Sequence, residues 1–162
     1  MKAAPFLVVA VLAGCASGPL PDALSNVRWQ EHVRDCAEEH GGSGLGTRID
    51  TVAKGDVNND GRVDTLVVDE CESKTSAWPQ VVEVFDGASD PARPALLGRL
   101  LEGDDVYPRQ IAVTVEPGGR VVVTGVGLSP DAPQCCPDLA LRKVFAFANG
   151  RFTQVESTAT PR

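Results

Sequence analysis

The chain has 162 residues, of which 43% are hydrophobic and 23% are charged, and its formal net charge is −7 at pH 7. This length fits one domain with a removable leader. The acidic balance argues against a nucleic-acid-binding protein and against adsorption on anionic lipid through charge, and it suits a divalent cation as a ligand.

The first fourteen residues have the organisation of an export signal. Lys2 supplies a positive start, and residues 3–13 form an apolar stretch too short to span a bilayer. Leu12-Ala13-Gly14-Cys15 then resembles the lipobox of bacterial lipoproteins, which implies a signal peptide at 1–14 and an acylated Cys15. We therefore expect a protein anchored by lipid on the extracytoplasmic face of the cell membrane or envelope. An ordinary secretory signal with an incidental Cys15 is the alternative.

Residues 15–21 are rich in small residues and proline and are typical of a tether, and a single globular domain at 22–157 follows. An apolar stripe with Trp29 predicts a helix over 23–39. After it, runs of alternating or β-branched residues predict strands at 65–68, 81–85, 110–116, 121–127 and 139–148, with weaker candidates at 45–54, 96–101 and 152–155.

Two turn signals support an antiparallel connection of these strands. Pro117-Gly118-Gly119 and Asn149-Gly150 are both typical of β-hairpins. The expected fold is therefore mainly β (α+β): an antiparallel meander of about six or seven strands with one N-terminal helix and two disulfides. Residues 158–162 are expected to form a disordered tail.

Residues 56–64 have the pattern of a calcium loop. Oxygen-bearing side chains stand at its positions 1, 3, 5 and 9, and these are Asp56, Asn58, Asp60 and Asp64. Gly61 stands at position 6, where the loop must turn sharply, and the backbone carbonyl of Arg62 offers a further oxygen. Because calcium takes six to eight oxygen ligands, the sequence predicts a Ca2+ site. A metal-free turn made of Asp and Asn side-chain hydrogen bonds is the alternative.

The loop is not a complete EF-hand. Position 12 is Val67 instead of a bidentate Glu, and the residues that follow the loop predict a strand, not a helix. In these respects the loop resembles the DxNxDGxxD loops of FG-GAP and VCBS-type calcium blades. Only one copy is present, which excludes a propeller.

Four cysteines remain after Cys15, namely Cys36, Cys71, Cys135 and Cys136. An even number in an exported domain predicts two disulfides. A bridge between adjacent cysteines closes a strained ring, so we expect Cys36 and Cys71 each to pair with one of Cys135 and Cys136.

The segment from His32 to His40 also allows a second interpretation, a zinc site. His32, Cys36 and His40 are spaced to lie on one helical face, where they could hold zinc with Cys71 as a fourth ligand. The alternative is a disulfide cysteine flanked by two solvated histidines.

No nucleophile elbow or phosphate-binding glycine loop is present in the sequence, so we predict that the protein is not an enzyme. Two acid pairs, Asp69-Glu70 and Asp104-Asp105, keep open a small hydrolase that uses acid–base chemistry near the calcium loop. Solvated surface acids explain the same residues without catalysis.

The C-terminal third carries a further resemblance. Cys135-Cys136-Pro137, the strand after it and the Asn149-Gly150 hairpin are together similar to small actinobacterial envelope lipoproteins of the LppP/LprE type. The resemblance implies an envelope lipoprotein and supplies no catalytic residues. We therefore expect a monomeric, lipid-anchored, calcium-stabilised domain that acts as a binding or structural module for an unknown protein or other envelope partner.

Overall fold

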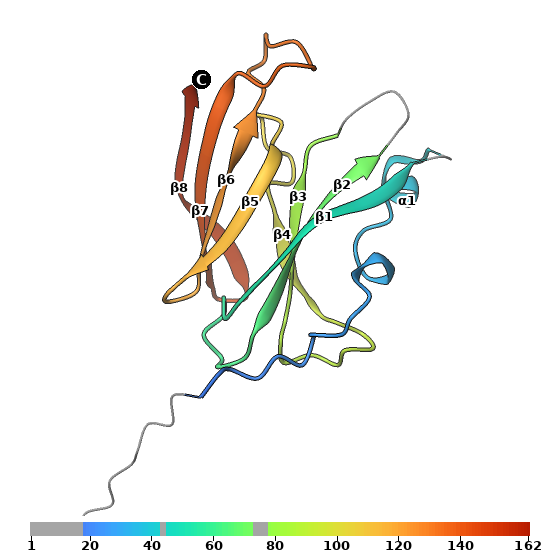
Figure 1. Cartoon of the computed structure of the whole chain (residues 1–162), viewed down its shortest axis with the longest axis vertical. Coiled ribbons are helices and arrows are strands. Elements are labelled where there is room, and N and C mark those ends of the chain that lie inside the picture. The colour runs from blue at the N-terminus through green and yellow to red at the C-terminus, as the bar shows by residue number, and fades with distance from the viewer. Residues whose placement is uncertain (1–17, 43–44, 73–77) are drawn as a thin grey trace, which may run out of the picture.

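A computed structural model describes residues 18–42, 45–72 and 78–162, which form eight strands in two four-stranded antiparallel sheets (Figure 1). Within each sheet the strands pair in chain order. The first sheet contains β1 (Gly46–Gly55), β2 (Asp64–Glu72), β3 (Val81–Phe85) and β4 (Leu96–Leu100). The second contains β5 (Arg109–Glu116), β6 (Arg120–Gly127), β7 (Leu139–Ala148) and β8 (Arg151–Pro161).

The expected mainly β, antiparallel meander is confirmed, but the expected count of six or seven strands is too low. The segments with weak patterns are full strands: β1 pairs with β2 over its whole length, and β4 completes the first sheet at its far edge. Both are edge strands whose side chains are mostly exposed or half-buried, so burial imposes little alternation on them.

The two sheets face each other and enclose the main hydrophobic core (Figure 1). Edge strand β1 lies beside β5, and β4 lies beside β8, so the two sheets also meet along their edges. Alternate side chains of the central strands point inward, as the pleat of a strand requires. The buried residues of this core include Leu66, Val68, Val82, Val84, Ile111, Val113, Val121, Val123 and Phe145.

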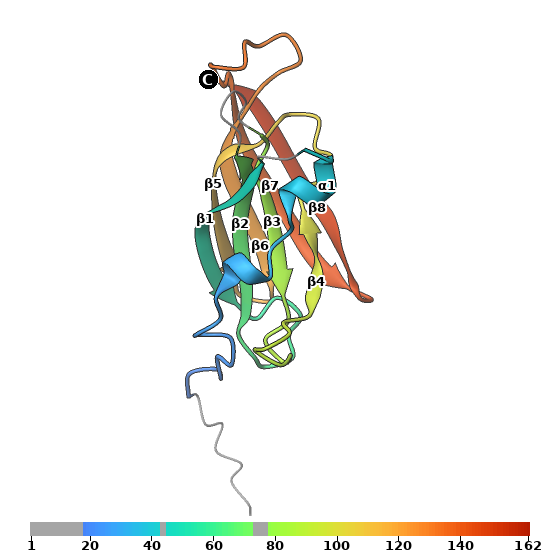
Figure 2. The same cartoon turned by 90° about the vertical axis from the view of Figure 1, so that its right-hand side faces the viewer.

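The N-terminal segment covers the outer face of the first sheet (Figure 2). Leu24 and Trp29 are buried there against Val67 and Phe85, and the rings of Trp29 and Phe85 are 4.8 Å apart. Strands β2 and β3 are consequently buried on both faces.

The expected N-terminal helix is present, but its expected extent over 23–39 is wrong. The segment contains only a 3-10 turn, η1 (Trp29–Glu31), and one short helix, α1 (Cys36–His40). At Arg34, between these two elements, the backbone bonds to the sheet instead of continuing a helix. The Arg34 N–H donates to Glu83 Oε2 (3.2 Å), and the Thr47 hydroxyl donates to the Arg34 carbonyl (2.7 Å). Asp35 then starts α1 by accepting hydrogen bonds from two backbone N–H groups.

Both predicted hairpin turns are confirmed. At the second, Asn149 and Gly150 have φ angles of +55° and +75° and connect β7 directly to β8. Strand β8 runs to Pro161, which pairs with Leu139, so the expected disordered tail at 158–162 is wrong. Its side chains are almost all exposed, and backbone pairing with β7 fixes it without a hydrophobic pattern.

Two disulfides are present, but their pairing differs from the expected one. Cys36 in α1 joins Cys71 at the end of β2, and Cys135 joins its neighbour Cys136. The cause is position: α1 lies over the first sheet, whereas Cys135 and Cys136 lie on an exposed loop between β6 and β7. In the described ranges, no helix is both long and apolar enough to cross a bilayer.

Candidate functional site

The loop between β1 and β2 curls around its own polar side chains. Asp56 Oδ1 and Asn58 Oδ1 both accept a hydrogen bond from the Asp60 N–H, at 3.1 and 3.0 Å. Asp56 Oδ2 accepts another from the Gly61 N–H (3.0 Å). Positive φ angles at Asn59 (+60°) and Gly61 (+82°) produce this curl. The oxygens of Asp56 and Asn58 therefore converge on one backbone donor.

Asp60 faces the same interior. Its Oδ1 accepts from the Arg62 N–H (2.8 Å), and its Oδ2 lies 3.3 Å from the Asn58 amide nitrogen. The structure thus brings together three of the four side chains expected to bind calcium. These hydrogen bonds form the Asp- and Asn-rich turn expected for the metal-free alternative, and each carboxylate oxygen retains a further lone pair.

Asp64 has a structural role that the sequence pattern did not indicate. Its side chain is fully buried, with Oδ2 accepting from the Val57 N–H (2.8 Å) and Oδ1 from the Gly87 N–H (2.7 Å). Burial raises the pKa of this carboxyl group, and the backbone N–H donors partly oppose that shift. Asp64 therefore ties the loop at 56–64 and the β3–β4 loop to the start of β2.

The loop also contacts the second sheet. The Val57 carbonyl packs so closely on Gly119, in the β5–β6 turn, that a Cβ there would lie 2.5 Å from this oxygen. The Asn59 amide donates to the neighbouring Gly118 carbonyl (3.3 Å). The loop is thus a joint between the two sheets.

The donors of the loop fit a hard cation in their chemistry. In the described part of the chain, no three His, Cys, Asp or Glu side chains gather closely enough to hold a metal ion. Calcium also takes amide and backbone carbonyl oxygens, which Asn58 and Arg62 supply beside Asp56 and Asp60. Asp64 can add to this set only through lone pairs that its backbone donors leave free.

The proposed zinc ligands are not brought together on one helix. Cys36 is in a disulfide with Cys71, which removes both thiolates. His32 follows η1, whereas His40 ends α1 and its ring stacks 4.4 Å from that of Trp78. The continuous helical face on which the zinc interpretation depends is absent from this segment.

Both acid pairs contain carboxylates that are already engaged by basic side chains. Asp69 is buried under the N-terminal segment, and its neighbour Glu70 pairs with Arg48. Asp104 pairs with Lys143. Adjacent residues of a strand point to opposite faces, so Asp69 and Glu70 do not converge on one reacting atom.

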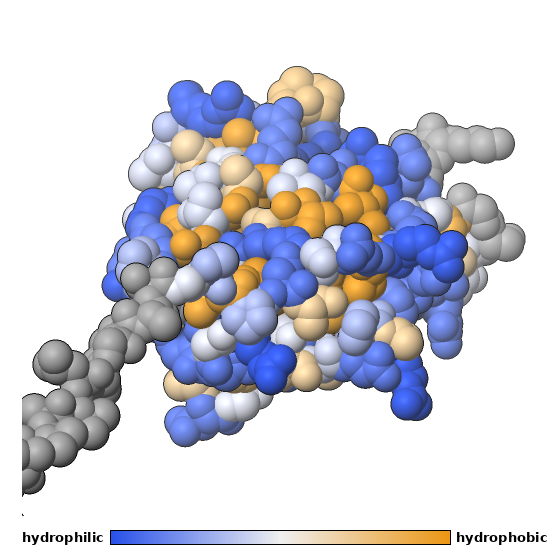
Figure 3. Space-filling view, turned by 60° about the horizontal axis from the view of Figure 1, so that its bottom comes forward, coloured by the Kyte–Doolittle hydropathy of each residue, from blue (hydrophilic) through white to orange (hydrophobic). Residues whose placement is uncertain are grey.

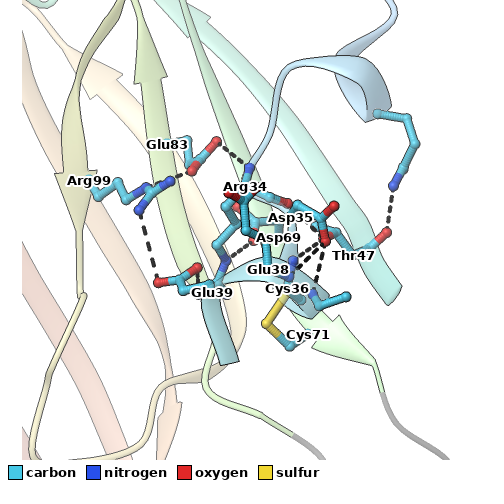
Figure 4. The surroundings of a disulfide bond; sticks show 12 residues. Arg34, Asp35, Cys36, Glu38, Glu39, Thr47, Asp69, Cys71, Glu83 and Arg99 are labelled. Atoms are coloured by element: carbon cyan, nitrogen blue, oxygen red, sulfur yellow. Dashed lines mark hydrogen bonds and ion pairs between the residues drawn. A yellow bond between two sulfur atoms is a disulfide. The ribbon is translucent and has the colours of Figure 1, made fainter. Parts of the chain in front are cut away.

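Asp69 instead belongs to an ion cluster, buried at Asp69 and Glu83 and open to solvent at Glu39, which we define as Arg34, Asp69, Glu83, Arg99 and Glu39 (Figure 4). Arg34 Nε donates to Asp69 Oδ1 (2.6 Å), and Arg99 Nε donates to Glu83 Oε1 (2.7 Å). Burial raises the pKa of Asp69 to about 6 and also raises that of Glu83, although both guanidinium groups oppose the shift. Sequence reasoning missed this cluster because its partners are 35 and 16 residues apart.

The described residues therefore offer a curled oxygen-rich loop, an ion cluster between the N-terminal segment and the first sheet, and two disulfides. The loop and the cluster lie at opposite ends of β2, which begins at Asp64 and holds Asp69 near its other end. No protein-family model, curated protein or solved structure matches the chain.

Proposed function

We propose that the chain is a lipid-anchored envelope domain that binds one calcium ion in the loop at 56–64 and acts as a binding or structural module. The observation that carries the proposal is the convergence of Asp56, Asn58 and Asp60 in a loop that joins both sheets. Asp64 and the Arg62 carbonyl would complete the ligand set. A bound ion would relieve the mutual repulsion of three carboxylates and hold the joint between the sheets.

The path of the chain supports an orientation for this domain. Cys15, the expected lipidation site, lies outside the described residues. The chain enters the domain at the calcium loop, where the Val63 N–H donates to the Pro21 carbonyl (3.0 Å) and Lys54 pairs with Asp22. Six residues from Cys15 to Pro21 reach at most about 20 Å. A lipid on Cys15 would therefore hold the calcium loop near the membrane and α1 away from it.

Thermal unfolding in calcium and in chelator tests the proposal. For a dissociation constant of about 0.1–1 mM, tenfold excess calcium should stabilise the protein by roughly 1.4 kcal/mol. For a domain of this size, that corresponds to a rise of about 3–6 °C in midpoint. Asp60→Ala should lose most of this rise.

Asp90→Ala is the matched control. Asp90 also accepts a hydrogen bond from a nearby backbone N–H (Ala92, 2.9 Å) on an exposed turn, but it lies outside the loop. This variant should keep the calcium-dependent rise. Equal midpoints of the wild type in the two buffers would refute the calcium site, and a rise lost equally from both variants would refute its location.

A further inference from the structure

A cavity of about 280 Å³ lies at the end of the sandwich opposite the calcium loop. Three chain segments form its walls: the end of α1, the residues before β3, and the loop between β4 and β5. We call it the aromatic pocket and define it by His40, Trp78, Tyr107, Leu101, Glu39 and Glu102. Its volume suits one small molecule.

The walls of the aromatic pocket are held in place by contacts outside it. Gln80, which is buried, fixes the segment that carries Trp78: its N–H donates to the Pro108 carbonyl and its Oε1 accepts from the Ile111 N–H, both at 2.8 Å. The disulfide of Cys36 holds α1, and with it His40, to β2. A pocket whose walls are fixed before binding loses less entropy when a ligand enters.

The third wall carries unusual backbone conformations. Leu101 and Tyr107 have φ angles of +69° and +46°, and Gly103 between them has +68°. Bulky residues rarely adopt positive φ, because the conformation costs of order 1–3 kcal/mol. Such conformations persist where the surrounding structure enforces them, and they concentrate at binding sites.

The lining combines aromatic rings with carboxylates. The rings of His40 and Trp78 stack at 4.4 Å. The guanidinium group of Arg109 lies 5.7 Å from the centre of the Tyr107 ring, so one face of this ring already holds a cation, and a ligand would use the remaining surface of the ring. Glu39 lies next to His40 in α1, and Glu102 lies on the same loop as Tyr107. The Glu102 side chain is 55% exposed.

The charges around the pocket favour a positive ligand. Arg34 lines the pocket, but its charge is matched by the buried Asp69. Arg99 contacts three carboxylates, those of Glu83, Glu39 and Glu102. Four carboxylates thus face three guanidinium groups when Arg109 beside Tyr107 is counted, which leaves an excess of one negative charge, and the chain as a whole is acidic. An added anion would be repelled, whereas an added cation would balance the excess.

We propose that the aromatic pocket binds a small organic cation with an apolar body, such as an alkylammonium, against Trp78 and Tyr107 and beside Glu39 and Glu102. This site deepens the binding role proposed above, and it is separate from the calcium loop. In the orientation proposed above for the lipid-anchored domain, the pocket opens at the end that faces away from the membrane.

Titration with choline and with its uncharged isostere 3,3-dimethylbutan-1-ol tests the proposal, because the two ligands share a shape and differ in charge. Binding is followed by calorimetry and by the fluorescence of a Trp29→Phe variant, in which Trp78 is the sole tryptophan of the chain. Choline should bind roughly three- to thirtyfold more tightly than the isostere. The full comparison is made in calcium and again in chelator, so that a failed calcium site leaves this result unaffected.

Glu102→Gln removes a charge from an exposed side chain and should therefore leave the fold intact. This variant should weaken choline binding by about two- to fivefold and leave the binding of the isostere unchanged. Glu116→Gln, which makes the same change at the exposed end of β5, should alter the binding of neither ligand. Equal binding of choline and the isostere, stronger binding of glucose than of choline, or no choline binding at about 10 mM would each overturn the assignment.

Discussion

Asp64 and Asp69 lie on the same strand, and both carboxyl groups are fully buried, but their partners differ. Asp64 accepts hydrogen bonds from two backbone N–H groups in neighbouring loops, whereas Asp69 pairs with the guanidinium group of Arg34. A carboxylate held by backbone donors organises the loops that donate to it. A buried ion pair contributes less stability than its short distance suggests, because both charges lose their hydration.

The first prediction concerns the pH dependence of stability at Asp69. Its pKa in the folded protein is about 6, above the ordinary value of 3.8, so the folded state binds this proton more tightly than the unfolded state. The stabilisation is fully present below about pH 4 and is lost as the pH rises through 6, by roughly 3 kcal/mol at most. Asp69→Asn should lack this loss and become relatively more stable as the pH rises.

Denaturant unfolding of both proteins at several pH values from 4 to 7.5, in chelator, measures this difference. Asp105→Asn, an exposed acid on the β4–β5 loop, is the control and should follow the wild type. A constant difference between Asp69→Asn and the wild type across this range would contradict the raised pKa.

The second prediction separates backbone strain from a steric clash at the joint between the sheets. Gly118 and Gly119 have φ angles of +85° and +77°, so alanine is strained at either by roughly 1–2 kcal/mol. An added Cβ at Gly118 meets nothing within 4 Å, whereas at Gly119 it lies 2.5 Å from the Val57 carbonyl. Gly119→Ala should therefore lower the free energy of unfolding by a further 1–3 kcal/mol or so. Equal losses in the two variants, measured by denaturant unfolding, would show that the loop at 56–64 does not press on this turn.

At the scale of elements, local patterns were sufficient for some strands and insufficient for others. The expected limits of β3 and β7 match the structure, because their apolar residues and adjoining turns are local signals. The helix over 23–39 failed because the backbone of Arg34 bonds to Glu83, which is 49 residues away. In the candidate site, the curl at Gly61 followed from the sequence, whereas the burial of Asp64 depends on Gly87 in a distant loop. No local pattern reports such contacts.

The third prediction concerns the disulfide that fastens α1 to β2. Cys36 and Cys71 are 35 residues apart, so Cys36→Ser/Cys71→Ser should lower the free energy of unfolding by roughly 3–4 kcal/mol. Cys135→Ser/Cys136→Ser is the control: adjacent cysteines close almost no chain, so its loss should be much smaller. A non-reducing peptide map that joins Cys36 or Cys71 to Cys135 or Cys136 would contradict this pairing.

At the scale of the whole molecule, the two ends of the sandwich differ. The lower end in Figure 1 carries the loop at 56–64 and receives the chain from residue 18. This end comes forward in Figure 3, where a band of hydrophobic residues is bordered by hydrophilic ones. Leu20, which is 47% exposed, lies where the chain enters. The other end carries α1 and the aromatic pocket. Our proposal places the first end toward the membrane.

The fourth prediction concerns the anchor itself. Cys15→Ser should release the protein from the membrane fraction or leave the precursor unprocessed, because the acylated sulfur is lost. Cys135→Ser/Cys136→Ser should stay in the membrane fraction, which controls for loss of a cysteine as such. Fractionation of cells that express each protein measures both results. Normal processing and retention of Cys15→Ser would show that the membrane is reached by another route.

The most direct test of the central claim is a calcium titration followed by the amide spectrum of the 15N-labelled protein. The amides of Asp60, Gly61 and Arg62 donate to loop side chains and should shift in a saturable way, with half-saturation at about 0.1–1 mM calcium. The amide of Gly119, against the loop, should shift with them, whereas that of Gly103, at the opposite end, should not. Unmoved loop amides at about 10 mM calcium, or shifts spread without saturation over the acidic surface, would contradict a calcium site in this loop.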